Sequence, residues 1–203
     1  MATYLVHDSR VTGRMPHGLA DAAMSVNQTT YLSGMINGVA RYADSHGGTI
    51  SHLYILAHGK YQNFQADTFQ MSFQTGGCGI QICSEDLTIG NLSLLNAWRG
   101  KITWITLFSC GIAAVNPQIQ SASAANRARG NGQMTTRYDG VNGQLFCQNF
   151  ANESGAIVIA SDLAQEYSCY VNPIERLFGS PGEIQTETLT EMEGNVRTFR
   201  PSR

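Results

Sequence analysis

Short apolar segments of strand length recur along this sequence, at residues 3–7, 51–59, 101–110 and 156–161. Stretches with the apolar spacing of a helix separate them. Strands that alternate with helices predict an α/β fold with a mostly parallel central sheet and helices on both faces, which is a three-layer α/β/α sandwich. In such a sheet the carboxyl ends of the strands meet at one edge, and ligands bind there. We therefore expect the chemistry of the chain at that edge.

Three stretches carry the helical pattern. From about residue 19 to residue 43 the apolar residues repeat on one helix face, and His46-Gly47-Gly48 ends the pattern. Residues 88–99 predict a second helix, in which the apolar residues stand three apart, at Ile89, Leu92, Leu95 and Trp98. Residues 142–153 predict a third helix, which precedes the last apolar segment.

Two segments alternate with the period of a strand and predict hairpins. One spans residues 68–87 and turns at Gly76-Gly77, and the other turns about Glu193-Gly194-Asn195 near the C-terminus. No repeat or long linker divides the chain. We therefore expect a single domain over residues 1–203, with a core at about 3–171 and a C-terminal hairpin extension at about 183–200.

Residues 112–140 show no clear periodicity and are rich in small and polar side chains. Such a long segment is typical of functional or mobile structure. We expect part of 116–137 to be a mobile loop that trypsin cuts first, at Arg127 or Arg129. An Ala-rich helix within 118–130 is the alternative.

The composition argues against several classes of partner. Charged residues make up 14% of the chain and the net charge is −2, so no strong field attracts nucleic acid or an anionic membrane. No apolar run approaches the roughly 20 residues that span a bilayer. The N-terminus lacks a basic segment followed by an apolar one, and the odd number of cysteines favours thiols in a reducing compartment. These features predict a cytoplasmic protein, with export by a route that needs no signal peptide left open.

Metal and nucleotide sites are not expected. Cys78 and Cys83 lack the CxxC spacing of a zinc site, and no second pair completes one. The TGGCG turn has neither the GxGxxG nor the P-loop pattern. The sequence therefore predicts a protein that needs no cofactor.

Two strand ends carry residues suited to nucleophilic catalysis. One apolar segment ends at His58-Gly59 and another at Ser109-Cys110. A cysteine nucleophile needs a base to form its thiolate and backbone N–H groups to bind an oxyanion. Neighbouring parallel strands lie about 4.8 Å apart, so the side chains of His58 and Cys110 can face one carbonyl group. Gly59 allows close backbone approach, and its N–H can join that of Cys110 in an oxyanion hole.

The same residue types elsewhere lack this context. His17 and His46 also precede glycine, yet neither ends an apolar strand. Cys83 lies in the predicted hairpin and Cys147 in a predicted helix. Only Cys110 ends a central strand, which favours a functional interpretation over one in which it is a packing residue.

The order of His58 before Cys110, each at a strand end and about 50 residues apart, resembles the caspase-like superfamily. That superfamily includes caspases, metacaspases, clostripain, gingipains, legumain, separase and the bacterial CHAT domains. Residues 143–162 resemble the helix and strand that follow the cysteine in bacterial members, and the likeness covers about residues 3–162. The resemblance implies a Cys110–His58 dyad, with Gly59 and Cys110 as oxyanion donors.

The chain departs from the family pattern beside the cysteine. Metacaspases have an Asp and caspases a Gln two residues before it, where this chain has Phe108. If that position lines the pocket for the P1 side chain, an apolar wall disfavours Arg or Lys there. Caspases also place a glycine two residues after the cysteine, where this chain has Ile112.

Two acidic residues at strand ends have open roles. Asp8 lies near the place where some relatives hold a polar residue that orients the histidine, or it caps the loop that follows. Asp162 lines the specificity pocket or caps a turn.

We therefore expect a cysteine peptidase that acts on a peptide or protein substrate. Only analogy with the superfamily suggests bacterial defence or an effector pathway, and a partner or immunity protein stays open. One alternative is a catalytically silent caspase-like module used for binding or assembly. The other is a flavodoxin-like ligand-binding domain in which Cys110 is buried and inert.

Overall fold

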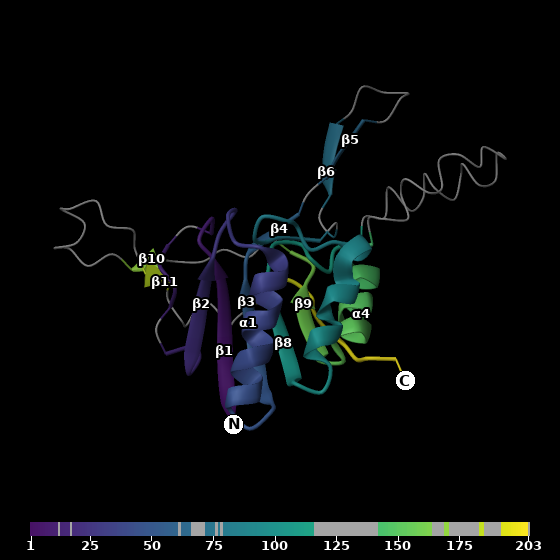
Figure 1. Cartoon of the computed structure of the whole chain (residues 1–203). Helices are drawn as coiled ribbons and strands as arrows, with labels where there is room; N and C mark the ends of the chain where they lie inside the picture. Colours follow the sequence, from purple (N-terminus) through teal and green to yellow (C-terminus); the bar gives the residue numbers. More distant parts are fainter. Residues whose placement is uncertain are drawn as a thin grey trace, which may run out of the picture.

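In the part of the chain that the structure, a computed structural model, describes, six strands form one central sheet in the order β12-β9-β8-β3-β1-β2 (Figure 1). The strands are β1 (Ala2–Asp8), β2 (Ala22–Val26), β3 (Ile50–Leu56), β8 (Ile102–Phe108), β9 (Ile157–Ser161) and β12 (Val196–Phe199). β12 pairs antiparallel with β9, whereas the other neighbours in this sheet pair in parallel. The chain therefore has the predicted α/β fold with a mostly parallel sheet, an arrangement compatible with a three-layer α/β/α sandwich.

The structure describes residues 1–11, 13–16, 18–60, 62–65, 72–75, 77, 79–115, 142–163, 169–170, 183–184 and 192–202. No helix in these ranges is both long and apolar enough to span a bilayer. The loop predicted at 116–137, the alternative helix at 118–130 and the tryptic sites at Arg127 and Arg129 lie outside the described residues.

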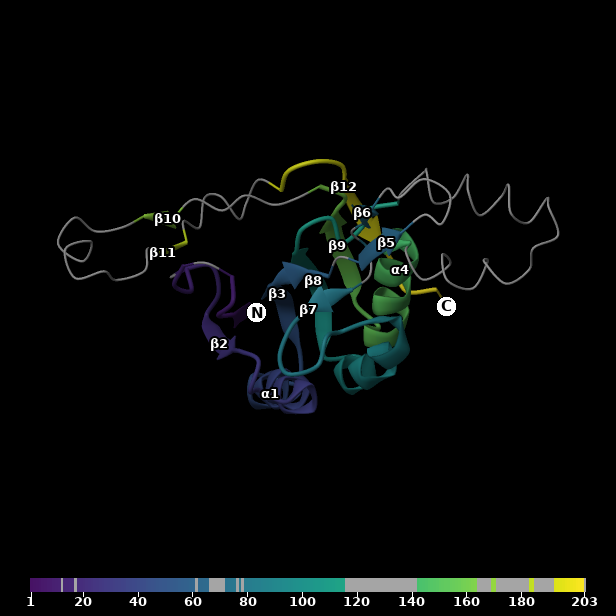
Figure 2. The same ribbon diagram turned by 90° about the horizontal axis from the view of Figure 1, so that it is seen from above.

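Helices α1 (Leu32–Ser45), η1 (Ile89–Trp98) and α4 (Gly143–Ser154) pack against one face of the sheet (Figure 2). Alternate residues of the strands point to this face, so Ile55 of β3 and Leu107 of β8 join the helices in the larger core. The Trp98 side chain is fully buried there, and its Nε1 donates a hydrogen bond to the carbonyl of Ile36 at 2.9 Å. This layer fixes the positions of β3 and β8.

The opposite face of the sheet holds a smaller core of buried residues. It consists of Leu5, Val11, Leu56, Phe108 and Ile184. Within the described ranges, loop residues such as Met15, Leu19 and Met192 pack against this core. β3 and β8 are thus buried on both faces toward their carboxyl ends, whereas Ser51 and His52 of β3 and Thr103 and Trp104 of β8 are half-buried or exposed.

The helix predicted at residues 19–43 is wrong in its first half. Residues 22–26 form the edge strand β2, and α1 begins only at Leu32. Asn27 separates the two elements, because its Oδ1 accepts hydrogen bonds from the backbone N–H and the hydroxyl of Thr29 at 2.8 and 2.7 Å. An asparagine side chain favours such a turn. The predicted end of the helix is confirmed: α1 ends at Ser45, and His46 is its C-cap.

The other two predicted helices are confirmed. η1 is a 3₁₀ helix, and the exact spacing of three between its apolar residues is the period of that helix. The side chains of Leu92, Leu95 and Trp98 are buried along it. Asn142 caps the start of α4, and its side chain accepts a hydrogen bond from the backbone N–H of Leu145.

The hairpin predicted at 68–87 is wrong in its pairing. β6 (Ser72–Thr75) pairs with β5 (Gln62–Gln65), whereas β7 (Ile80–Gln81) pairs with β4 (His58–Gly59). Gly77 has a φ of +82°, and a Cβ atom there would lie 2.7 Å from the backbone nitrogen of Gly143. A glycine is therefore needed at position 77 for this close contact with the start of α4.

The C-terminal stretch completes the central sheet. β12 pairs with β9, in the register Val196 with Ser161. The turn predicted about residues 193–195 is present, with Gly194 at a φ of +85°. Residues 185–191, which include most of the part of the predicted hairpin that precedes this turn, lie outside the described ranges, so the hairpin extension stays a prediction. Further away, β10 (Cys169–Tyr170) and β11 (Glu183–Ile184) form a separate antiparallel pair.

Candidate active site

His58 and Cys110 follow the ends of two adjacent strands. β3 and β8 run parallel with Leu56 paired to Phe108, and the N–H of Ala57 donates to the carbonyl of Phe108 at 3.3 Å. His58 and Cys110 each stand two residues beyond that last pair. The register therefore brings both residues to the same edge of the sheet, where the sequence predicts the site.

Gly59 lies directly against the backbone of Cys110. A Cβ atom on Gly59 would stand 2.0 Å from the carbonyl oxygen of Cys110 and 3.3 Å from its nitrogen. No residue with a side chain fits this contact without a shift of the backbone. The structure thus brings together three of the residues that the sequence singles out.

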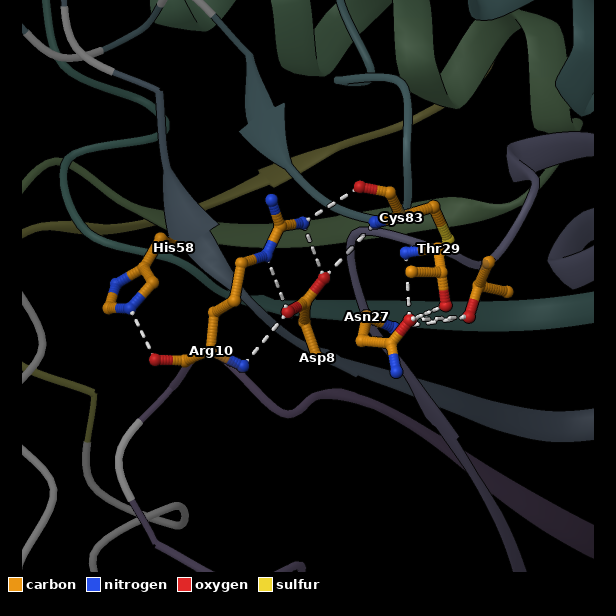
Figure 3. A network of polar contacts seen from close by, with 7 residues as sticks. Asp8, Arg10, Asn27, Thr29, His58 and Cys83 are labelled. Atoms are coloured by element: carbon orange, nitrogen blue, oxygen red, sulfur yellow. Dashed lines mark hydrogen bonds and ion pairs between the residues drawn. The ribbon is translucent and has the colours of Figure 1, made fainter.

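Two contacts fix His58, one at its backbone and one at its ring. Its backbone belongs to β4, where His58 pairs with Gln81 of β7. Its Nε2 lies 3.0 Å from the carbonyl oxygen of Arg10, in a half-buried setting (Figure 3). A carbonyl only accepts hydrogen bonds, so we assign a proton to Nε2, which leaves Nδ1 of the neutral ring as the basic nitrogen.

Asp8 does not touch His58 but binds Arg10 instead. Its Oδ1 accepts hydrogen bonds from the backbone N–H and Nε of Arg10 at 3.0 and 2.8 Å, and its Oδ2 pairs with Nη2 at 2.7 Å (Figure 3). The Asp8 side chain is completely buried. Burial alone would raise the pKa of Asp8, but the hydrogen bonds from Arg10 and Cys83 and the charge of Arg10 hold it below its ordinary value. The sequence left Asp8 two roles, to orient the histidine or to cap the loop that follows β1, and its direct contacts are those of a loop cap.

Cys83 joins the same network through its backbone. Its N–H donates to Oδ2 of Asp8 at 3.1 Å, and its carbonyl accepts from Nη2 of Arg10 at 3.0 Å. Its φ of +59° is a conformation that residues with side chains seldom adopt. Neither Arg10 nor Cys83 was singled out for the site from the sequence. Arg10 has a sequence signal, because it stands two residues after Asp8 at a strand end. Cys83 has none, because it takes part only through its backbone.

The turn that follows Cys110 is fixed to the end of β9. Gly111 has a φ of +59°, and its N–H donates to the carbonyl of Leu163 at 2.8 Å. The N–H of Ala113 donates to the carbonyl of Ser161 at 3.0 Å. Ile112, where caspases have a glycine, is fully buried in the larger core. Packing of this turn therefore holds Cys110 in place.

The described thiols differ in their surroundings. Cys110 is half-buried at the edge of the sheet, whereas Cys83 and Cys147 are buried. Burial, with a contribution from the charge of Asp8, raises the pKa of Cys83 to about 12. Burial also raises the pKa of Cys147. These two thiols are therefore poor nucleophiles at neutral pH.

Phe108 lines a pocket of about 330 Å³ on the sheet face opposite the helices. The other lining residues are Leu19, Tyr54, Thr106, Ile159, Met192 and Val196. Asp162 is not among them: its carboxylate accepts hydrogen bonds from the backbone N–H and side-chain amide of Asn195, both at 2.9 Å. The structure thus gives Asp162 the role of a turn cap.

No protein-family model, curated protein or solved structure matches this chain. Within the described ranges, no three His, Cys, Asp or Glu side chains gather as metal ligands do. The function is therefore inferred from the residues at this edge of the sheet.

Proposed function

We propose that this chain is a cysteine peptidase of the caspase-like type, with Cys110 as nucleophile and His58 as general base. The observation that supports this most directly is the placement of His58-Gly59 and Cys110 at adjoining strand ends, with the two backbones in close contact. The hydrogen bond from His58 to the carbonyl of Arg10 adds support, because it leaves Nδ1 of the ring to accept a proton.

The reaction would proceed through an acyl-enzyme. Nδ1 of His58 takes the thiol proton as Sγ of Cys110 attacks the carbonyl carbon of the scissile peptide. The tetrahedral intermediate collapses, the C–N bond breaks, and His58 gives its proton to the leaving amine. Water, deprotonated by His58, then attacks the thioester and releases the carboxylate product and the thiol. Each step uses only residues of the chain and water.

The oxyanion would be bound by backbone N–H groups of Gly59 and Cys110. Gly59 pairs with Ile80, and the next bond of the β4–β7 ladder runs from the Lys60 N–H to the Gly79 carbonyl at 2.8 Å. In an antiparallel pair of this kind the N–H of Gly59 itself points away from β7. It can therefore donate to a substrate oxygen rather than to the ladder.

An irreversible peptidyl electrophile tests the proposal. We expect a peptidyl acyloxymethyl ketone to label Cys110 in the folded protein, as located by mass spectrometry, and peptide hydrolysis to be lost in Cys110→Ala. His58→Gln should lower both labelling and hydrolysis. His46→Gln is the matched control, because His46 also precedes a glycine but lies exposed at the end of α1.

The same experiment separates the proposal from its alternatives. A folded protein in which Cys110 resists the electrophile and no peptide is cut contradicts the peptidase. That result favours a silent binding module of the same fold or a ligand-binding domain.

A further inference from the structure

We propose that Asp8 is a positioning residue for His58 and that it acts through the backbone of Arg10. This inference rests on the proposed role of His58 as the base. Asp8 fixes the loop at the end of β1, and that loop presents the carbonyl group that holds the imidazole ring.

The first step of the argument is the orientation of one peptide group. The carbonyl of Arg10 and the N–H of Val11 belong to the same peptide, and in a trans peptide they point in opposite directions. The N–H of Val11 donates to the backbone carbonyl of Asp8 at 2.9 Å. The carbonyl of Arg10 must therefore point away from the end of β1, and it meets Nε2 of His58.

The second step is that the Asp8 carboxylate binds both the backbone N–H and the guanidinium of Arg10. One oxygen accepts from the backbone N–H and Nε of Arg10, and the other accepts from Nη2. The backbone and the guanidinium are thus bound to one carboxylate that has no exposed surface. A buried charge is costly unless it is paired in good geometry, so this arrangement resists distortion.

The pair also connects the loop to the opposite side of His58. Cys83 follows β7 closely, and its N–H and carbonyl bind Asp8 and Arg10 respectively. β7 in turn pairs with β4 through Gln81 and His58. The same ion pair therefore fixes the acceptor of the ring and anchors the segment that continues from the strand beside it (Figure 3). A carboxylate that merely capped the loop would need neither the guanidinium nor Cys83.

The expected consequence of losing Asp8 is a disordered imidazole. In Asp8→Asn the charge is lost, and the amide cannot accept from all four donors at once. The peptide group of Arg10 then keeps only the bond from the Val11 N–H to the backbone carbonyl of residue 8, so the Arg10 carbonyl is held less firmly. The proton of neutral His58 then distributes between Nδ1 and Nε2. We expect kcat to fall by about 10- to 100-fold, with KM changed less than about 3-fold, because Asp8 contacts no substrate.

The experiment combines kinetics with ¹⁵N-NMR of the histidine rings, at a pH where His58 is neutral. In the unmodified protein His58 should give the signals of a ring protonated at Nε2, and in Asp8→Asn the two ring nitrogens should move toward averaged shifts. Asp21→Asn is the matched control: Asp21 is also an Asp that holds the backbone of β1, at Thr3, but at the far end of the strand. It should change neither kcat nor the His58 signals.

Arg10→Lys provides a second variant if Asp8→Asn fails to fold. It keeps a positive charge beside Asp8 but loses the fork that reaches Asp8 and Cys83 together. We expect a smaller drop in kcat and a partial shift of the ring signals.

The outcomes separate the two proposals. If the folded variants keep both the Nε2–H signals and kcat, Asp8 does not position His58 and the inference is wrong. If neither the unmodified protein nor any variant cuts a peptide but the ring signals change as expected, the positioning role holds and the peptidase proposal fails.

Discussion

The backbone of Gly59 lies so close to that of Cys110 that a Cβ atom on Gly59 would stand 2.0 Å from the carbonyl oxygen of Cys110. Real side chains essentially never approach a backbone atom so closely. The contact joins the end of β4 to Cys110, the second residue after β8, and it sets the separation between the two halves of the candidate site. Glycine at position 59 is thus a requirement of the geometry around Cys110.

Gly59→Ala should therefore damage both the site and the fold. We expect peptide hydrolysis to be lost and the free energy of unfolding to fall by about 1–3 kcal/mol, because the added methyl group overpacks a backbone contact. Denaturant unfolding and a hydrolysis assay measure the two effects. The matched control is Gly34→Ala in α1, where a Cβ atom meets nothing closer than Tyr31 Cβ at 3.9 Å. It should stabilise the protein by about 0.5–1 kcal/mol. Equal effects of the two substitutions would contradict the close approach.

The thiols should react with iodoacetamide in a fixed order at neutral pH. We expect modification of Cys110 within minutes, whereas Cys83 and Cys147 stay unmodified until the protein unfolds, because burial raises the pKa of both. Peptide mapping by mass spectrometry gives the three rates. In His58→Gln the rate at Cys110 should fall, since the proposed base is missing. Faster modification of Cys83 than of Cys110 would argue against the assignment of the nucleophile.

The main features of the fold and the His58–Cys110 pair follow from local sequence patterns. The apolar strands end abruptly at polar residues, and parallel strands bring such ends to one edge. Likewise, the apolar residues of 89–98 stand three apart in the sequence, and this spacing is the period of a 3₁₀ helix rather than of an α-helix. The order of these elements was therefore predictable without knowledge of distant contacts.

The features that the sequence did not reveal depend on distant contacts or on weak patterns. β2 is an edge strand that contains Ala22 and Ala23, and alanine favours a helix over a strand. β7 pairs with β4 rather than with β6, and the alternation within such short segments does not indicate which segment each one pairs with. The acceptor of His58 is a backbone carbonyl, which every residue carries, so no residue type marks it.

Two histidines, the buried His7 and the half-buried His52, should make stability depend on pH. Burial lowers the pKa of His7, although the charge of Asp8 and a hydrogen bond with the backbone of Val11 act in the opposite direction. Burial lowers the pKa of His52 as well. Each ring is therefore neutral in the folded protein at a pH where the unfolded chain already binds a proton. Their contribution to stability is complete above the unfolded value of about 6.5 and is lost as the pH falls below it.

We expect the urea concentration at the midpoint of unfolding to decrease as the pH is lowered from 7.5 to 5. Both His7→Gln and His52→Gln should reduce the slope of that decline, because each removes one group that binds a proton on unfolding. Urea denaturation of each variant at several pH values measures how steeply its midpoint depends on pH. An unchanged slope in both variants would show that neither ring is held in its neutral form.

Substrate preference should follow the pocket that Phe108 lines. Aromatic and aliphatic side chains dominate its wall, and Phe108 stacks on Tyr54 with ring centroids 6.1 Å apart. Asp162, the acidic residue that could favour a basic P1 side chain, binds Asn195 instead. A charged side chain would lose its hydration in such a pocket without gaining a partner. In a peptide library we therefore expect cleavage after Leu, Met or Phe to exceed cleavage after Arg or Lys by at least about 10-fold.

A charge introduced at the pocket provides the sharper form of this test. Val196 lines the pocket and is 47% exposed, so Val196→Glu should fold and bring a carboxylate to its mouth. We expect that variant to gain cleavage after Arg and Lys relative to Leu, because the carboxylate pairs with a basic P1 side chain. Leu94→Glu, at an apolar residue of η1 that is 42% exposed, is the matched control and should leave the preference unchanged. Strong cleavage after Arg or Lys by the unmodified protein would show that the P1 side chain binds elsewhere, and the same shift in both variants would show that it comes from net charge rather than from the pocket.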